Sequence, residues 1–224
     1  MTRPTLSPTA RSTPRRHPER ARTDRSELDA VLDAGLICHL GLVMDGAPVV
    51  LPTAYGRDGD TIYLHGSSGA SSLLAARPEI DACVTVSLLD GIVYARAAFS
   101  HSINYRSAVI HGKARIVDEP DEKWHGLDVV TEHLAPGSWD YTRQPSKKEL
   151  AKTNVLAMDL TEAAVKVRAE GPGCEDEDKA VTGMWAGVLP VVRSWGAPIT
   201  ADFVDPNVGV PAHVSQRQWQ SKKG

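Results

Sequence analysis

The chain has little of what marks a secreted or a membrane-spanning protein. Its 224 residues include only three cysteines, Cys38, Cys83 and Cys174, whose spacing matches neither a disulfide framework nor a metal site. Scattered cysteines of odd number are typical of reduced thiols, so we expect a cytoplasmic protein. No run of about 18 apolar residues occurs, so no membrane-spanning helix is expected. The formal net charge is −3, which gives no reason to expect a nucleic-acid partner.

The two ends of the chain differ in composition from the middle. Residues 1–23 carry six arginines among prolines and hydroxyl residues, with few large apolar side chains. Such a segment is expected to be a disordered basic tail. Its Arg15-Arg16 pair is not followed by a hydrophobic segment, so it does not indicate a twin-arginine export signal. Residues 24–200 have the composition of one globular domain, and residues 201–224 are expected to form an irregular C-terminal tail.

Strand signals dominate the middle of the chain. Short β-branched and apolar segments are separated by Asp45-Gly46, Asp58-Gly59 and Asp90-Gly91, dipeptides that are typical of tight hairpin turns. Helices are expected over Ser26–Ala34 and Pro120–Leu134. Strands are expected over Leu36–Met44, Ala47–Tyr55, Thr61–Leu64, Ile80–Leu88, Ile92–Ala98, Ser107–Val117 and Asn154–Arg168, with a polar connection at His101–Arg106. Several short strands with tight turns and few helices predict a mostly β protein built on a small antiparallel barrel.

The stretch Asp60–Ala76, DTIYLHGSSGASSLLAA, has the pattern of a phosphate site. A strand runs into a tract of glycines and serines, and a helix is expected to follow over residues 70–77. Glycines permit close approach of the backbone to a ligand, and the first free N–H groups of a helix favour an anion. The alternative is a polar turn that binds nothing.

Three motifs and their order carry a resemblance to a known family. YLHGSSGASSLL at 63–74 is followed by a strand pair, then by HSINYRSAVIHGKARIV at 101–117 and by WAGVLP at 185–190. Over about residues 25–200 this arrangement resembles the pyridoxamine 5′-phosphate oxidase-related proteins, in particular the branch that contains the nitroimidazole-resistance proteins. The resemblance implies an FMN-binding, six-stranded antiparallel split β-barrel.

The resemblance also implies a homodimer that holds FMN in two clefts at its interface. The strand Val50–Thr53 would lie beside the flavin ring, the tract that begins at His65 would surround the phosphate and ribityl chain, and Trp185 would approach from the other subunit. His65 is the candidate catalytic residue, as a phosphate donor or a source of a proton. The cofactor-binding candidates are Val50, Leu51, Pro52, Thr53, Leu64, His65, Gly66, Ser67, Ser68, Ser71, Asn104, Tyr105, Arg106, Ser107 and Trp185, and no metal ligand is expected.

The chain departs from true pyridoxamine phosphate oxidases at their basic phosphate clamp. Gly69-Ala70-Ser71 stands where those enzymes have Ser-Arg-Lys, and the arginine of their late tryptophan motif is missing after Trp185. Losing charge-assisted donors weakens phosphate binding by roughly a few kcal/mol, unless Arg106, Arg77 or Lys113 replaces them. The departures argue against vitamin B6 synthesis.

The function expected from these residues is that of an FMN-dependent oxidoreductase. The flavin would pass electrons to a small electrophilic acceptor such as a nitro compound, a quinone or oxygen. Two alternatives stay open: a non-catalytic flavin- or haem-binding carrier or sensor, and an enzyme that uses a deazaflavin cofactor. The eight histidines show no spacing that marks a haem ligand, so haem is a minority interpretation.

Overall fold

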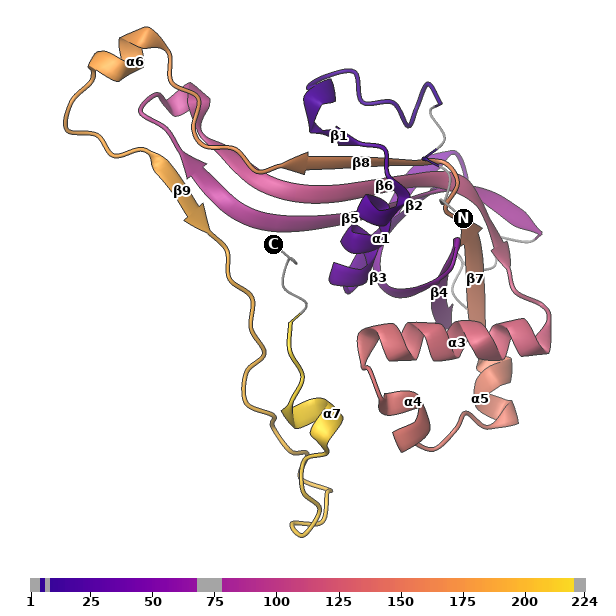
Figure 1. The fold of residues 1–224 in the computed structure, drawn as a ribbon. Coiled ribbons are helices and arrows are strands. Elements are labelled where there is room, and N and C mark those ends of the chain that lie inside the picture. The colour runs from indigo at the N-terminus through magenta and orange to yellow at the C-terminus, as the bar shows by residue number, and fades with distance from the viewer. Residues whose placement is uncertain (1–4, 7–8, 68–77, 220–224) are drawn as a thin grey trace.

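Six antiparallel strands close into a ring (Figure 1). The computed structural model describes residues 5–6, 9–67 and 78–219. Neighbours pair in the order β2–β3–β4–β7–β6–β5, and β5 pairs back with β2. The ring strands are β2 (Ile37–Met44), β3 (Ala47–Asp58), β4 (Thr61–Ser67), β5 (Glu79–Tyr94), β6 (Ser102–Ile116) and β7 (Thr153–Asp159). The predicted six-stranded antiparallel split barrel is therefore confirmed. Its sixth strand is β7, and the separate strand predicted over Ile92–Ala98 is instead the end of β5 as far as Tyr94.

The helix α1 (Arg25–Ala34) closes the core, one residue longer at its start than predicted. Its side chains Leu28, Val31 and Leu32 are at most 1% exposed and pack with the inward-facing strand residues. The remaining helices are α3 (Pro120–Leu134), with the predicted bounds, and the short α4 (Ser138–Tyr141), α5 (Lys147–Lys152), α6 (Asp176–Ala180) and α7 (Ala212–Ser215), with 3-10 turns at Pro18–Arg20 and Ala98–Ser100. The helix expected over residues 70–77 lies outside the described residues.

The first hairpin follows the turn chemistry of the sequence. Asp45 and Gly46 have φ angles of 51° and 78°, and both lie in the left-handed region that a tight hairpin turn requires. The flanking strands pair residue for residue from Met44 with Ala47 up to Ile37 with Ala54. The predicted β2–β3 hairpin is confirmed.

The turn predicted at Asp90-Gly91 is wrong, because β5 runs through it as one strand with a bulge between Leu89 and Gly91. Arg106 on the neighbouring strand holds the Asp90 carboxylate, because its Nε and Nη2 atoms each donate a hydrogen bond of 2.9 Å to one carboxylate oxygen. A Cβ atom on Gly91 would lie 3.0 Å from the carbonyl oxygen of Leu189. The glycine therefore serves the close approach of another strand, β9 (Gly187–Pro190), rather than a turn.

The C-terminal part of β5 and the N-terminal part of β6 leave the ring together as a long ribbon (Figure 1). Along this ribbon β6 exchanges its partner β7 for β8 (Ala163–Arg168), and β5 exchanges β2 for β9. The segment His101–Arg106, predicted as a polar connection, is strand from Ser102 onward because it pairs with β5. The single strand predicted over Asn154–Arg168 is two strands, β7 and β8, because residues 160–162 between them are not strand.

The N-terminal segment differs from the disordered tail that its composition predicts. Ala21–Arg22 forms the short strand β1, which pairs with β8. Leu6 is 6% exposed and belongs to the core cluster. Arg11 forms a bidentate ion pair with Glu162, at 2.8 and 2.6 Å. The burial of Leu6 and the ion pair of Arg11 with Glu162 thus hold the N-terminal segment against the barrel, although this segment has no hydrophobic core of its own.

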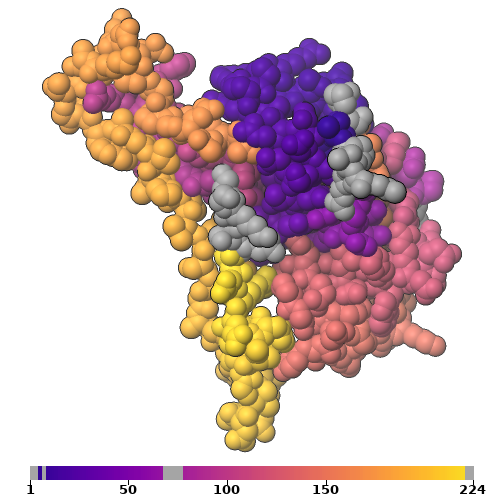
Figure 2. Space-filling model, viewed as in Figure 1, coloured from indigo at the N-terminus to yellow at the C-terminus, as the bar shows by residue number. Residues whose placement is uncertain are grey.

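Residues 185–219, called the C-terminal arm below, leave the barrel and return to it. After β9 the arm runs down one side of the molecule, and Arg217 then donates a hydrogen bond to the carbonyl oxygen of Leu134 at the end of α3. Figures 1 and 2 show much of the arm standing apart from the barrel. Within the described part of the chain, no helix has the length and apolarity needed to cross a membrane.

Candidate functional site

His65 lies at the end of β4, beside a cavity formed by the helices α3, α4 and α5. The cavity, called the His65 cavity below, has a volume of about 320 Å³, within the range of small-molecule sites. Leu64 points into the barrel core, so its neighbour His65 points to the outer face of the sheet, where it lies opposite Val155 of a second hydrophobic cluster. The lining residues are His65, Leu127, Thr131, Trp139, Arg143, Pro145, Glu149, Leu150 and Thr153.

The His65 cavity combines apolar walls from Leu127, Trp139 and Leu150 with the imidazole of His65 and the ion pair of Arg143 and Glu149. Partial burial of the imidazole lowers the pKa of His65 below its usual value, so the ring is neutral at pH 7. Among the described residues no side chain or backbone group forms a hydrogen bond or ion pair with this imidazole. Arg143 is held by Glu149 at 2.9 and 2.8 Å, which leaves the pair with no net charge. A neutral imidazole with a free lone pair can bind a metal centre or accept a proton.

The residues expected beside the flavin ring alternate along β3. Val50 is 63% exposed and Pro52 is also exposed, and both face outward from the barrel, whereas Leu51 and Thr53 are half-buried. Leu64, included among the candidates, is 1% exposed and points into the core. Of these four candidates, only Val50 and Pro52 therefore form an apolar surface on the outer face of β3.

The candidates on β6 are already engaged in the structure of the ribbon. Asn104 is buried, and its amide oxygen accepts a hydrogen bond of 2.6 Å from Arg168. Arg106, a possible replacement for the missing phosphate clamp, is bound to Asp90. Tyr105 and Ser107 lie on either side of it in the same strand.

Within one chain the predicted site residues do not converge. Arg115 on β6 and Tyr63 on β4 both pair with Ala157 of β7, so they mark one level of the ring. Arg106 is nine residues farther along β6, which amounts to roughly 30 Å of strand. Trp185 is 67% exposed and packs against Tyr94 at the far end of β5, with 5.8 Å between ring centroids. Gly66 and Ser67 are beside His65 in β4, while Ser68 and Ser71 lie outside the described residues.

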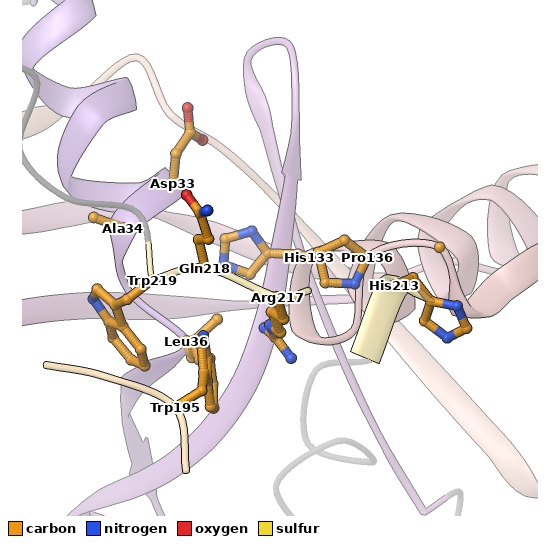
Figure 3. Close-up of a pocket in the computed structure, with 11 residues that line it drawn as sticks. Asp33, Ala34, Leu36, His133, Pro136, Trp195, His213, Arg217, Gln218 and Trp219 are labelled. Carbon is orange, nitrogen blue, oxygen red and sulfur yellow. The ribbon is translucent and has the colours of Figure 1, made fainter. Parts of the chain in front are cut away.

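A second cavity, of about 420 Å³, opens between the C-terminal arm and the ends of α1 and α3 (Figure 3). His133 faces it, and the Nε2 atom of this residue donates a hydrogen bond of 2.6 Å to the carbonyl oxygen of Gly35. Burial lowers the pKa of His133 and keeps its ring neutral. The ring of Trp195 packs against that of Trp219 with 4.8 Å between ring centroids and a tilt of 40°, and both residues belong to the arm.

Sequence reasoning missed most of both cavities. The helical spacing of Leu127 and Thr131 places them on one face of α3, but nothing local shows that this face meets His65. Trp139 and Leu150 reach the same cavity from two short helices. Trp195 lies in a stretch with no strand or helix pattern, and the residue that its ring contacts, Trp219, is 24 residues away in the sequence.

The ring of six strands with an extended ribbon defines a split-barrel protein of the flavin-binding type. Residues 24–167 match the family described as pyridoxamine 5′-phosphate oxidase, and the chain belongs to that family. No curated protein matches the chain.

Solved structures extend the likeness over nearly the whole chain. The flavocytochrome Anf3 from Azotobacter vinelandii is 35% identical with a TM-score of 0.87, and the match covers 94% of this chain and 98% of that one. The FAD and heme binding protein from Mycobacterium smegmatis is 37% identical with a TM-score of 0.84, over 89% and 97%. A putative 5-nitroimidazole antibiotic resistance protein from Bacteroides thetaiotaomicron shares the fold, at 23% identity and a TM-score of 0.54, over 66% and 86%.

Proposed function

We propose that this chain is a redox protein that binds a flavin and a haem and passes electrons from a reductant to a small electrophilic acceptor. The observation that carries the proposal is the His65 cavity, in which a neutral imidazole with no hydrogen-bond partner among the described residues faces apolar and aromatic side chains. Two relatives of more than 30% identity, whose names include flavocytochrome and FAD and heme binding, support it.

The residues of the His65 cavity fit a haem. Iron takes a neutral imidazole nitrogen, and His65 supplies one without having to break a hydrogen bond to a described residue. Trp139, Leu127 and Leu150 supply the apolar surface that a porphyrin needs. When bound, the haem would supply one-electron transfer. His65 would hold the iron, and the three apolar side chains would exclude water from it.

The flavin would lie on the outer face of β3, where Val50 and Pro52 form an apolar wall. FMN is the form expected from the sequence, whereas the M. smegmatis relative is named for FAD. Because the residue groups lie far apart within one chain, the proposed flavin site needs two copies, and we propose a homodimer. The flavin would accept electrons in pairs, and selectivity for a nitro compound, a quinone or oxygen would come from the shape of the pocket.

Besides binding the haem iron, His65 has a second proposed role, which concerns the flavin. The resemblance implies a donor to the flavin phosphate or a source of a proton, and Gly66 and Ser67 follow it in the same strand. The alternative function is that of a non-catalytic carrier or sensor. Such a protein would bind the same cofactors but would not catalyse electron transfer to an acceptor.

The test is an absorption spectrum of the purified protein, with the flavin released by acid and separated by chromatography to distinguish FMN from FAD. We expect a Soret band together with flavin bands. His65→Ala is compared with His125→Ala as a control. His125 lies on α3 but does not line the cavity, and its Nε2 atom is 2.9 Å from the carboxylate of Asp58 on β3. Loss of the Soret band with flavin retained, in His65→Ala alone, supports haem ligation. Loss of flavin alone assigns His65 to the phosphate, and a wild-type protein that takes up neither cofactor overturns the proposal.

Turnover separates the enzyme from the carrier. The protein is mixed with NADH or NADPH and, in turn, with a nitroaromatic compound, a quinone and oxygen. Oxidation of the nucleotide that depends on the bound flavin supports the oxidoreductase. A fully loaded protein that shows no turnover with any of these pairs favours the carrier or sensor.

A further inference from the structure

The cavity of about 420 Å³ between the C-terminal arm and the ends of α1 and α3 has no part in the proposed haem and flavin sites. It is called the arm cavity below (Figure 3). Its volume lies within the range of small-molecule sites, and none of the residues that line it also lines the His65 cavity. Segments far apart in the sequence form it, so the cavity exists only while the arm lies against the helices.

Two indole rings of the arm supply the aromatic surface of the arm cavity. The ring centroids of Trp195 and Trp219 lie 4.8 Å apart, and the ring planes are tilted by 40°. Trp195 is 41% exposed and Trp219 is half-buried, so the pair is not sealed inside a core. Ala34 and Leu36, at the end of α1, add apolar surface nearby (Figure 3). A flat aromatic molecule can pack against these rings, either stacked or edge-on.

Arg217 brings a positive charge to the arm cavity. Its guanidinium lies 4.2 Å from the ring centre of Trp195, and its Nη2 atom donates a hydrogen bond of 2.7 Å to the carbonyl oxygen of Leu134. Neither partner carries a formal charge, and within the described part of the chain no carboxylate pairs with this guanidinium. Its Nε and Nη1 donors also have no acceptor among the described residues. These donors favour an anionic ligand.

The groups on the other side of the arm cavity limit how much negative charge it accepts. The Asp33 carboxylate is bound by Arg57, whose Nη2 atom lies 2.8 and 2.9 Å from its two oxygens, so that pair has no net charge. His133 is neutral because burial lowers its pKa, and its Nε2 atom already donates to the carbonyl oxygen of Gly35. A single uncompensated guanidinium therefore suits a carboxylate better than a phosphate dianion.

We propose that the arm cavity binds a small planar aromatic carboxylate. The rings of the ligand would lie against Trp195 and Trp219, and its carboxylate would accept hydrogen bonds from the unpaired donors of Arg217. A guanidinium matches a carboxylate in shape as well as in charge. The bound ligand would join the arm to the ends of α1 and α3. The site requires neither haem nor flavin, so it goes beyond the proposed function.

The first test is isothermal titration calorimetry of the purified protein with naphthoate. Three matched probes are titrated in parallel: naphthalenemethanol lacks the charge, cyclohexanecarboxylate lacks the aromatic ring, and AMP carries a dianion. We expect naphthoate to saturate one site per chain and each of the other probes to bind about tenfold more weakly or worse, because a charged hydrogen bond contributes at least this much. An absence of saturable naphthoate binding overturns the proposal. Equal or tighter binding of any other probe overturns the assigned ligand class.

The second test locates the site with variants. Arg217→Gln removes the charge, and Arg115→Gln is the matched control, because Arg115 is paired with Glu122 at 3.1 Å and does not line the cavity. Arg217 also holds the arm to α3, so affinity alone is not decisive. The decisive quantity is the ratio of the dissociation constants of naphthalenemethanol and naphthoate. A loosened arm weakens both probes alike, whereas loss of the carboxylate partner brings the ratio close to one.

The ratio should keep its wild-type value in Arg115→Gln. A wild-type ratio in Arg217→Gln overturns the role of this arginine. Trp195→Leu should weaken naphthoate and naphthalenemethanol together by about tenfold, since it removes an aromatic surface that both use. Trp124→Leu, on α3 and outside the arm cavity, is its control and should change neither. Equal affinities in the two tryptophan variants overturn the proposed site.

Cofactor spectra separate this proposal from the proposed function. The Soret and flavin bands are recorded at each step of the naphthoate titration, and they should not change, because the arm cavity shares no residue with the His65 cavity. Displacement of haem or flavin by naphthoate assigns the arm cavity to a cofactor and overturns the proposal. A protein that takes up neither cofactor overturns the proposed function alone, and its naphthoate titration still decides on the arm cavity.

Discussion

Gly56→Ala tests how closely α3 is seated on the barrel. Gly56 is buried in β3, directly below the helix. A Cβ atom there would lie 2.4 Å from the carbonyl oxygen of Val129 and 2.8 Å from the amide nitrogen of Val130. Both contacts are to backbone, which no rotamer change can relieve. Since an ordinary carbon contact begins near 3.4 Å, α3 would have to move outward by about 1 Å.

The expected cost follows from overpacking. Small-to-large changes in a well-packed core cost about 1–3 kcal/mol. A loss of about 2 kcal/mol corresponds to a fall in Tm of about 4–8 °C for a chain of this length. Because α3 also carries Leu127 and Thr131 into the His65 cavity, the same variant should weaken binding in that cavity.

The assay is urea denaturation followed by far-UV circular dichroism at one protein concentration. Gly41→Ala is the matched control, since it is also a strand glycine. Its added Cβ would lie 3.4 Å and 3.7 Å from atoms of Cys83, which is ordinary contact. The control should change stability by less than about 1 kcal/mol. If the two variants unfold at the same urea concentration, the helix is not seated as tightly as the structure shows and the reasoning fails.

Three further changes test other contacts. Tyr55→Phe removes a buried hydroxyl that donates a hydrogen bond of 2.5 Å to the carbonyl oxygen of Leu32, with that of Gly35 at 3.1 Å. The change should cost about 1 kcal/mol, measured by urea denaturation, and an unchanged midpoint would contradict it. Glu162→Gln weakens the bidentate pair with Arg11, so trypsin should cleave the N-terminal segment faster, and equal rates would show that the pair does not anchor it. Burial lowers the pKa of His133 below its usual 6.5, so stability is full above pH 6.5 and falls as the pH drops from there through the folded-state pKa. His133→Gln should therefore lose less Tm between pH 7.5 and 5.5 than the wild type, and an equal loss would refute this.

The barrel was predictable where local chemistry decides the chain path. At Asp45-Gly46 both residues adopt positive φ and the strands pair as predicted. At Asp90-Gly91 the same dipeptide lies inside a continuous strand, because Arg106 holds the aspartate and β9 approaches the glycine. Both contacts come from residues distant in the sequence, and the dipeptide alone does not reveal them.

The candidate site was predictable only in part, for a related reason. The position of His65 near the end of a strand follows from the β-branched, aromatic and apolar residues Thr61–Leu64 that precede it. The cavity beside it is completed by α3, α4 and α5, and their packing depends on tertiary contacts. The N-terminal segment shows the same limit: its charge composition predicts disorder, but the acidic side chain that holds Arg11 is 151 residues away.

The split of the barrel explains why the two proposed cofactor sites belong to different parts of the molecule. The first half of β5 pairs with β2 and the last residues of β6 pair with β7, and these pairings close the ring. The end of β5 pairs instead with β9, and the first half of β6 pairs with β8. Residues around the ring, including His65, are gathered with α3–α5 within one chain. Residues on the ribbon and the arm, including Arg106 and Trp185, extend away from the ring and reach a ligand on its outer face only if another copy brings them there. A haem in the His65 cavity should therefore survive loss of the dimer, whereas a flavin on the outer face of β3 should not.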